Sequence, residues 1–271
     1  MTRDDVQRIL RQIGLRPQQA AGQNFLLNDD ICQAMVDAAG VGPDDTVLEI
    51  GPGLGCLTDV LLATGARVVA VELDKRLAAY LRRKYRGQSK LILVEGDIFR
   101  VNLNDHLEDQ GYKLVANLPY SGTSLIFRNF LTLRPRPTSL TTMIQSDVAK
   151  RITAEPGEMS LLSLLVQYYS VPHILMTVPA TDFFPIPRVQ SAVLHCEPVQ
   201  THDEDEAKQL FRLARAGFAS RRKQLHNSLA SSFHLTTADI DKHLDQVGIK
   251  PSRRAQELSV AEWLRLAKEL G

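Results

Sequence analysis

Short apolar runs alternate with longer stretches of helical periodicity between residues 28 and 170, and this alternation constrains the fold more than any other feature of the sequence. Continuous runs of Val, Ile and Leu are typical of strands that helices cover on both faces of a parallel sheet. The sequence therefore predicts an α/β domain. Five runs are spaced for strand–helix–strand crossovers, namely Thr46–Ile50, Arg67–Val71, Leu91–Glu95, Lys113–Ala116 and Leu140–Ile144.

Two later runs, His173–Val178 and Ser191–Cys196, flank a Pro-rich stretch and predict an antiparallel strand pair that closes the sheet. After the acidic tract His202-Asp-Glu-Asp-Glu206 the pattern is helical throughout, so we place a domain boundary near residue 200. The prediction is a sheet domain over residues 1–200 and a small all-helical domain over residues 201–271. Its expected helices are Leu210–Ala219, Arg222–Ser231, Ala238–Val247 and Val260–Leu270.

Charge is unevenly distributed along a chain that is nearly neutral as a whole. The 271 residues include 32 Lys and Arg against 31 Asp and Glu, so affinity for a polyanion must come from a local cluster. Residues 207–238 contain six Lys or Arg and no Asp or Glu, and Arg221, Arg222 and Lys223 are consecutive. This segment is a candidate phosphate-contact surface. The alternative is a solvated helix face beside the acidic residues 202–206.

Several other classes of protein are poor fits. Cys32, Cys56 and Cys196 are odd in number and form no CxxC pair, so we expect buried thiols in a reducing cytosol rather than a disulfide framework. The seven histidines lack metal-ligand spacing, and no metal site is expected. The charged N-terminus and the absence of a long apolar window predict a cytoplasmic protein that is not bound to a membrane.

The strand Thr46–Ile50 runs directly into the Gly-rich turn Gly51-Pro-Gly-Leu-Gly55. Glycines permit a tight turn and let a ligand approach the backbone without a Cβ in the way. The third glycine comes one residue earlier than in the GxGxxG dinucleotide fingerprint, which favours a ligand without a diphosphate over an NAD-linked oxidoreductase. A simple strand-to-helix turn is the alternative for this motif alone.

Acidic side chains follow the next two strands. Glu72 lies 21 residues after Gly51, where a carboxylate can accept hydrogen bonds from both ribose hydroxyls, and Asp97 can accept from an adenine amino group. Either acid alone could be a solvated loop residue. Because ligands of open α/β sheets bind at the carboxyl ends of the strands, the three strand ends together predict an adenosine-binding crevice.

The fourth strand ends in Asn117-Leu118-Pro119-Tyr120. The lone pair of a purine amine is delocalised into the ring, so a methyl acceptor of this kind needs hydrogen-bond acceptors directed at its N–H groups. The Asn117 side-chain oxygen and the Leu118 backbone carbonyl can supply them, while Tyr120 offers a face for base stacking. An Asn-Pro turn with a packing tyrosine is the alternative.

The motifs together resemble those of the small-subunit (16S) rRNA adenine N6,N6-dimethyltransferase family, whose loss confers kasugamycin resistance. The resemblance covers residues 20 to 270. The motifs that carry it are Gly22-Gln-Asn-Phe-Leu26, Glu49-Ile-Gly-Pro-Gly-Leu-Gly55, Val71-Glu-Leu-Asp74, Gly96-Asp97, Asn117-Leu-Pro-Tyr120, residues 183–193, Arg221-Arg-Lys223 and Arg254-Ala-Gln-Glu-Leu-Ser259.

This resemblance implies a Rossmann-like class I methyltransferase sheet and S-adenosylmethionine as cofactor. It also implies dimethylation of N6 on two adjacent adenosines in the 3′-terminal hairpin loop of small-subunit rRNA, within a pre-ribosomal particle, by a monomeric enzyme. The implied cofactor-binding residues are Asn24, Leu26, Gly51, Glu72, Asp97 and Asn117. The implied catalytic residues are Asn117, Leu118, Tyr120 and Phe183, and the implied RNA-binding residues are Arg221, Arg222 and Lys223.

Phe183 has two readings, base contact and core packing. Three departures from the family pattern bear on target choice: a single basic residue in residues 16–21, Ser121-Gly122 after Tyr120, and an altered loop at residues 155–163. Two rival functions share the fold, namely a large-subunit rRNA adenine methyltransferase and a non-catalytic ribosome-assembly or transcription factor. Intact Glu72, Asp97 and Asn117 speak against the non-catalytic rival.

Overall fold

The computed structural model describes residues 1–17, 23–107, 111–120, 122–199, 203–220 and 222–270. The chain forms two compact units, Met1–Ala149 with His173–Pro198, and Lys150–Pro172 with Val199–Gly271. The break at Pro198 lies beside the boundary expected near residue 200, and residues 150–172 pack with the helices that follow this break. Within the described part of the chain, no helix combines the length and apolarity needed to cross a bilayer.

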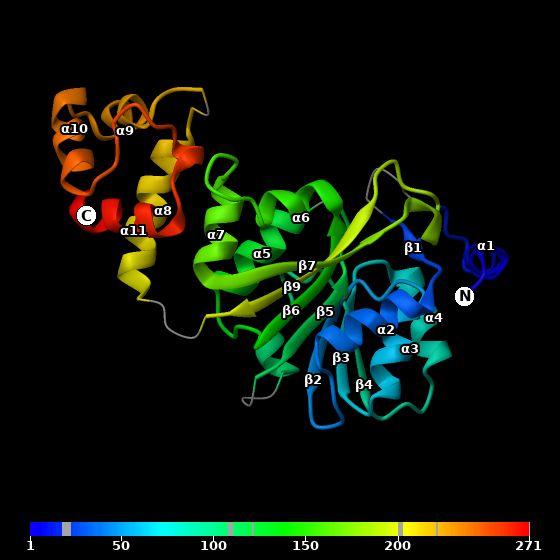
Figure 1. Cartoon of the computed structure of the whole chain (residues 1–271). Helices are drawn as coiled ribbons and strands as arrows, with labels where there is room; N and C mark the ends of the chain where they lie inside the picture. The colour runs from blue at the N-terminus through cyan, green and yellow to red at the C-terminus, as the bar shows by residue number, and fades with distance from the viewer. Residues whose placement is uncertain (18–22, 108–110, 121, 200–202, 221, 271) are drawn as a thin grey trace. The chain divides into compact units, whose positions relative to one another are not determined.

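A seven-stranded sheet with strand order β4-β3-β2-β5-β6-β9-β7 organises the first unit (Figure 1). The first five strands of that order are parallel and β9 is antiparallel to β6, which confirms the predicted α/β sheet of Rossmann-like type. The bounds are β2 Thr46–Ile50, β3 Arg67–Glu72, β4 Leu91–Glu95, β5 Lys113–Asn117, β6 Ser139–Gln145, β7 Ser170–Val178 and β9 Ser191–Pro198.

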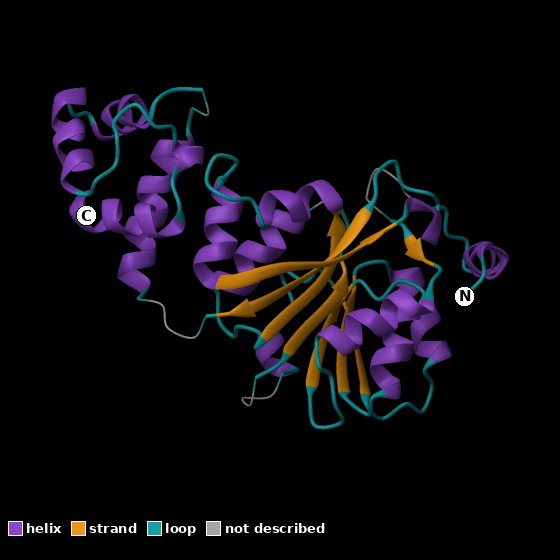
Figure 2. Ribbon diagram, viewed as in Figure 1, coloured by secondary structure: helices purple, strands orange, loops and turns teal. Residues whose placement is uncertain are grey.

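The central strands are buried because helices flank the sheet (Figure 2). Every residue of β2 is buried, as the continuous apolar run predicted. Local capping fixes where two of the helices begin, since Asn28 accepts a hydrogen bond from the Asp30 N–H, and Asp74 from the Arg76 N–H. The helices are α2 Asp29–Ala38, α3 Cys56–Ala63, α4 Lys75–Lys84, α5 Thr123–Thr132 and α6 Ser146–Ile152.

A small two-stranded sheet lies apart from the main one. It pairs β1 (Phe25–Leu26) with β8 (Phe183–Phe184) in antiparallel register, so that Leu26 faces Phe183. Helix α1 (Arg3–Gln12) packs Val6 and Leu10 into an apolar cluster that also contains Phe25, Leu54 and Leu77. The N-terminal segment is thereby attached to the Gly-rich turn. Among the described residues of this unit, short 3₁₀ helices span η2 Leu103–Asp105 and η3 Ala180–Asp182.

The second unit is helical. Trp263 is fully buried and stacks on Phe218, and Tyr169 stacks on Phe211. These rings form a core of ordinary aromatic pairs. The elements are α7 Leu161–Tyr169, α8 Glu204–Phe218, α9 Leu225–Phe233, α10 Thr237–Gln246, η4 Ala255–Glu257 and α11 Val260–Leu270.

Two predicted helix starts in this unit are wrong. Helix α8 begins at Glu204 rather than Leu210, because the Asp203 side chain caps it and three acidic residues occupy the favourable first turn. Helix α9 begins at Leu225 rather than Arg222, since Gln224 is extended with a ψ of 150°. Arg222 and Lys223 therefore lie in the turn before α9.

Candidate functional site

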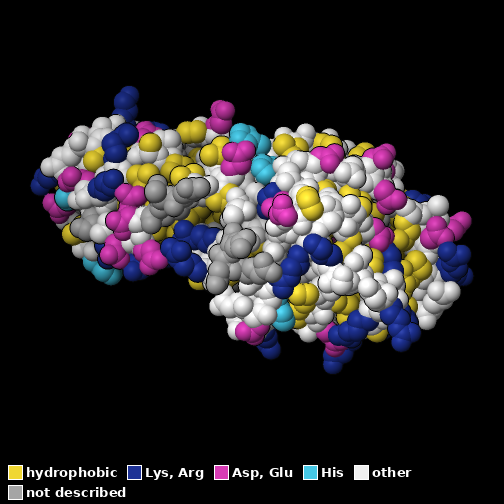
Figure 3. Space-filling view, turned by 90° about the horizontal axis from the view of Figure 1, so that it is seen from below, with side chains coloured by type: hydrophobic (Ala, Val, Ile, Leu, Met, Phe, Trp, Pro, Cys, Tyr) yellow, Lys and Arg dark blue, Asp and Glu magenta, His cyan; other side chains and the backbone are white. Residues whose placement is uncertain are grey.

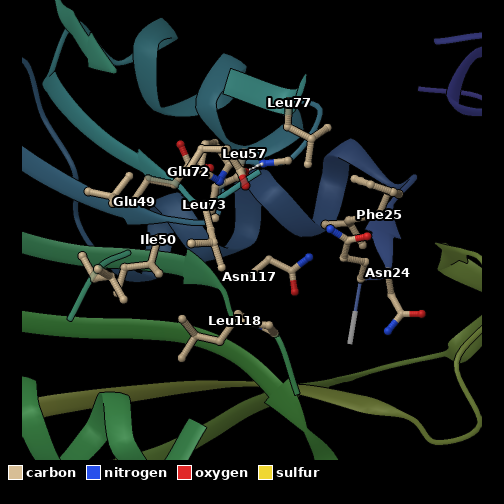
Figure 4. A pocket seen from close by; sticks show the side chains of 18 of the residues that line it. Asn24, Phe25, Glu49, Ile50, Leu57, Glu72, Leu73, Leu77, Asn117 and Leu118 are labelled. Carbon is tan, nitrogen blue, oxygen red and sulfur yellow. Dashed lines mark hydrogen bonds between the residues drawn. The ribbon is translucent and has the colours of Figure 1, made fainter. Parts of the chain in front are cut away.

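A cavity of about 350 Å³ lies at the carboxyl ends of β2, β3, β4 and β5. This is the edge at which ligands of open α/β sheets bind. Figure 4 shows the Asn117 side chain between the strand-end residues Glu72 and Leu73 and the N-terminal residues Asn24 and Phe25. All the cofactor-binding and catalytic residues implied by the sequence line it, namely Asn24, Leu26, Gly51, Glu72, Asp97, Asn117, Leu118, Tyr120 and Phe183.

The Gly-rich turn forms one wall of the cavity. Gly51 and Gly53 have φ angles of +69° and +60°, in the left-handed region that side chains disfavour. A Cβ on Gly53 would come within 3.4 Å of the Phe25 ring. The left-handed backbone of this turn, rather than a lack of space, is what favours glycine at both positions.

Glu72 is held at the end of β3 by backbone donors. Its side chain is only 5% exposed, and its two oxygens accept hydrogen bonds from the Gly53 N–H at 3.0 Å and the Asp74 N–H at 2.9 Å. Burial raises the pKa of Glu72 above its ordinary value, and the two backbone donors oppose that shift. The carboxylate is fixed in place and retains lone pairs for a ligand hydroxyl.

Glu49, one residue before the end of β2, is a second buried carboxyl in the cavity wall. It is 1% exposed, and the Thr58 hydroxyl donates to its Oε2 at 2.7 Å. Burial raises its pKa to about 8, and the nearby Glu72 adds to the shift. Glu49 is therefore mostly protonated at neutral pH.

Asp97 follows β4 and is partly exposed at the cavity edge. Its Oδ1 accepts from the Phe99 N–H at 3.0 Å, and its Oδ2 lies 3.7 Å from Arg100 Nε. The Asx-type turn orients the side chain without burying it. Glu72 ends β3 and Asp97 follows the neighbouring strand β4, so both acids lie at the same edge of the sheet.

The turn after β5 carries Asn117, Leu118 and Tyr120. The Leu118 N–H donates to the Met143 carbonyl of β6 at 3.0 Å, which fixes the turn to the sheet. The Tyr120 hydroxyl lies 2.8 Å from Ser191 Oγ on β9, and burial raises the pKa of Tyr120. Gly122, at a φ of +94°, precedes α5, so glycine suits this departure from the family pattern; Ser121 lies outside the described residues.

Phe183 lines the cavity but is only 1% exposed and belongs to the apolar core that includes Leu26 and Met143. Core packing is thus its role in this conformation. Base contact stays a prediction, which requires more of the ring to be uncovered.

The basic residues predicted to bind RNA belong to the second unit. Arg222 and Lys223 are exposed, and Arg221 lies outside the described residues. On the face drawn in Figure 3, Lys and Arg side chains (dark blue) are interspersed with Asp and Glu (magenta), in keeping with the near-neutral chain. The altered loop at residues 155–163 is attached to η4, since the Gly157 and Met159 N–H groups both donate to the Gln256 carbonyl.

Sequence reasoning missed two features of the cavity, an apolar surface and a pair of cysteines. Leu73, 71% exposed, and Phe99 present apolar surface beside Glu72 and Asp97, and their positions after strand ends could have indicated it. Cys32 and Cys56 also line the cavity, with their sulfur atoms 3.1 Å apart. The spacing of these two cysteines in the sequence does not predict their contact. Among the described residues, no group of three or more His, Cys, Asp or Glu is arranged to hold a metal ion.

A parallel sheet closed by an antiparallel strand, with acidic and amide side chains around one cavity at its carboxyl edge, is the Rossmann-like fold found in many methyltransferases. Solved structures support this fold. The chain superposes on a dimethyladenosine transferase from Plasmodium falciparum with a TM-score of 0.75 and 23% identity, covering 89% of this chain and 95% of that one. The 23S rRNA methyltransferase ErmE gives a TM-score of 0.73 at 24% identity, covering 91% and 99%.

Sequence relatives narrow the class. The chain is 41% identical to Ribosomal RNA small subunit methyltransferase A of Dehalococcoides mccartyi, over 94% of this chain and 89% of that protein. It is 39% identical to the protein of the same name from Moorella thermoacetica, over 97% and 95%. The model of the ribosomal RNA adenine dimethylase family matches residues 15–271. The chain belongs to the ribosomal RNA adenine dimethylase family, and is an rRNA adenine methyltransferase with an S-adenosylmethionine-type cofactor.

Proposed function

We propose that this enzyme transfers methyl groups from S-adenosylmethionine to N6 of two adjacent adenosines in the 3′-terminal hairpin loop of small-subunit rRNA. The relatives named for the small subunit support this target. The observation that carries the proposal is that Glu72, Asp97 and the Asn117–Tyr120 turn line one cavity. The methyl donor and the acceptor base can therefore bind in the same cavity.

The residues of the cavity fit S-adenosylmethionine. The walls of the cavity are mostly apolar with a few fixed polar groups, as in small-molecule sites generally. The buried Glu72 carboxylate would accept from the ribose hydroxyls and Asp97 from the adenine amino group, with Leu73 and Phe99 beside the base. Asn24, Leu26 and the Gly51 backbone would hold the methionine end. When bound, the cofactor supplies an electrophilic methyl group on a sulfonium.

Asn117 and Leu118 would prepare the acceptor nitrogen. The Asn117 Oδ1 and the Leu118 carbonyl would accept the two N6 hydrogens, drawing the nitrogen toward a tetrahedral shape and exposing its lone pair. Since β5 and the Leu118–Met143 hydrogen bond fix the backbone of this turn, the Leu118 carbonyl needs no rearrangement when the base arrives. Orientation of this kind can contribute up to about 7 to 11 kcal/mol to a bimolecular transfer.

Tyr120 would hold the base by stacking, with its ring positioned by the Ser191 contact. Stacking of this kind contributes about 1 to 3 kcal/mol per base. Phe183 would contact the other face. The methylated nitrogen becomes acidic, so water can remove its proton, and a second transfer requires the pocket to admit the methylated base. Unpaired loop bases can be extruded at least cost.

The second unit would supply RNA affinity. Arg221, Arg222 and Lys223 would contact phosphates, which give affinity without sequence discrimination. We propose that the substrate is a pre-ribosomal particle in the cytoplasm and that the enzyme acts as a monomer. One chain supplies every residue used in the cofactor and base sites.

Asn117→Ala tests the function. The variant should lose at least about 10²-fold in methyl transfer to under-methylated small-subunit particles, because the acceptors that orient the amine are lost. Cofactor affinity should fall far less than methyl transfer, because Glu72, Asp97 and the Gly51 backbone would still hold the cofactor. Exposed Asn104→Ala in the same unit is the matched control and should retain wild-type activity.

Mass mapping of the labelled RNA identifies the target. Two methyl groups on each of the paired loop adenosines would support the proposal. Label in large-subunit rRNA would assign the protein to that rival function. No transfer to any rRNA by the wild-type protein, with the cofactor bound, would favour the non-catalytic rival.

A further inference from the structure

Two cysteines that are 24 residues apart in the sequence meet in the cavity wall. Cys32 lies on α2 and Cys56 is the first residue of α3, and their Sγ atoms are 3.1 Å apart. Both thiols are free. The role of the cavity in methyl transfer uses neither sulfur.

We propose that Cys32 and Cys56 form a reversible intramolecular disulfide in the folded protein, a redox modification site in the wall of the cofactor cavity. The formation of this disulfide is inferred from the short distance between the two sulfur atoms. Its effect on the cofactor rests on the proposed function.

Proximity favours this bond. A disulfide needs an S–S distance of about 2.0 Å, so the two sulfurs must approach by only about 1 Å. Helices α2 and α3 pack against each other, which keeps the two side chains adjacent in the native state. The sulfur atoms therefore have only a short distance to close.

The two thiols differ in their access to an oxidant. Cys32 is fully buried, whereas Cys56 is partly exposed. The Cys56 thiol also donates to Asp29 Oδ1 at 3.0 Å, and Asp29 in turn pairs with the Met1 ammonium group at 3.2 Å. Cys56 is thus the sulfur that an oxidant meets first, and Cys32 the one that resolves the reaction.

The surroundings make this reaction slow near neutral pH. The hydrogen bond with Cys32 and burial raise the pKa of the Cys56 thiol, and the Asp29 carboxylate adds to the shift. Since the thiolate is the attacking form, oxidation should accelerate as pH rises.

A low-molecular-weight disulfide is a sufficient oxidant, and the exchange balances. The Cys56 thiolate attacks one sulfur of the oxidant, so that its S–S bond breaks and one thiol leaves, taking up the proton that Cys56 lost. Cys32 then attacks Cys56 in the mixed disulfide and releases the second thiol, which takes the Cys32 proton. Two protein thiols are oxidised and one disulfide is reduced to two thiols.

The bond should weaken cofactor binding. It removes the Cys56–Asp29 hydrogen bond and draws the start of α3 toward α2, directly after the turn whose Gly53 N–H positions Glu72. Conversely, a cofactor that fills the cavity should shield the sulfurs that line it. If the cofactor binds only the reduced protein, cofactor binding and disulfide formation oppose each other.

The experiment treats native full-length protein with oxidised glutathione at mildly alkaline pH, followed by intact-mass and peptide mapping. Wild type and Cys196→Ser should each lose two hydrogens and yield a Cys32–Cys56 linked peptide, reversible by dithiothreitol. Cys32→Ser and Cys56→Ser should form no internal bond. Circular dichroism before oxidation establishes that both variants are folded.

Two results would overturn the proposal: a native wild-type protein that retains all its thiols under these conditions, or linked peptides that pair either cysteine only with Cys196 or with another molecule. S-adenosylhomocysteine is the probe for the cofactor arm and should slow oxidation of the wild type at least about threefold at saturation. If the linked peptide forms and this probe does not bind, the proposed function fails and the disulfide stands.

Discussion

The two units place a carboxyl group in opposite electrostatic environments, fully buried at Glu49 and partly exposed at Glu262. In the sheet unit, the Thr58 hydroxyl donates a hydrogen bond to Glu49. No other donor to this carboxyl is found among the described residues, and burial raises its pKa to about 8. In the helical unit, Glu262 pairs with Arg253, caps α11 with Ser259 and has its pKa lowered to about 2. One carboxyl costs stability when ionised and the other contributes stability when ionised.

The difference separates a site built for a ligand from a module built to fold. Glu49 and Glu72 lie in the cavity wall, where desolvation raises the pKa of both. Buried carboxyl groups with raised pKa values lower the stability of the fold when they ionise, and such groups are typical of functional sites. The Arg253–Glu262 pair lies outside the cavity lining and serves the helical core.

Glu49→Gln should remove a pH dependence of stability. Because burial raises the folded pKa above the ordinary 4.5 to about 8, the wild type is most stabilised by this group below pH 4.5 and loses that contribution as pH rises to about 8. The free energy of unfolding should fall by about 1 kcal/mol per pH unit across this window, and the variant should flatten that slope. Urea unfolding at several pH values measures it.

Thr58→Val provides the control for this effect. The Thr58 hydrogen bond lowers the Glu49 pKa, so removing it should extend the wild-type slope to higher pH. An unchanged slope in Glu49→Gln would mean that Glu49 is ionised throughout the range.

Glu72→Gln should weaken S-adenosylhomocysteine binding about 30- to 100-fold. Hydrogen bonds to charged groups contribute about 1.5 to 3 kcal/mol, and the neutral amide also loses one of its two backbone contacts. Glu95, the register partner of Glu72 on β4, is exposed and lies outside the cavity lining, so Glu95→Gln should bind normally. Isothermal titration calorimetry compares the pair; equal affinities would remove Glu72 from the cofactor site.

The sequence was sufficient where one local pattern determines one element. The apolar runs predicted the strands of the sheet because burial on both faces demands them, and the strand-end acids and Asn117 line a common cavity because parallel strands end at one edge. The Cys32–Cys56 contact could not be predicted, since it depends on how α2 packs on α3. The start of α9 was missed because nothing in the basic run signals that Gln224 is extended.

Glu262→Gln should lower the free energy of unfolding of the helical unit by about 1 to 2 kcal/mol at neutral pH, a value discounted for partial solvent access. The pKa lowered from 4.5 to about 2 means that the contribution is present above pH 4.5 and is lost as pH falls toward 2. The thermal unfolding transitions of wild type and variant should therefore differ at pH 7 and converge at acidic pH. Convergence at both pH values would mean that the Arg253 pair contributes nothing.

The double variant Arg222→Ala and Lys223→Ala should have the smallest effect. Both side chains are solvated, so they contribute to RNA affinity only by an electrostatic attraction that salt screens. RNA affinity should fall by up to about tenfold at moderate salt, and the slope of log affinity against log salt should shrink by about 1 to 2, as for the loss of two phosphate contacts. The control is Lys242→Ala with Lys250→Ala, exposed residues outside the basic segment. Cofactor binding should be unchanged in both. If the slope stays at the wild-type value, these residues form a solvated face, and affinity must come from elsewhere in the chain.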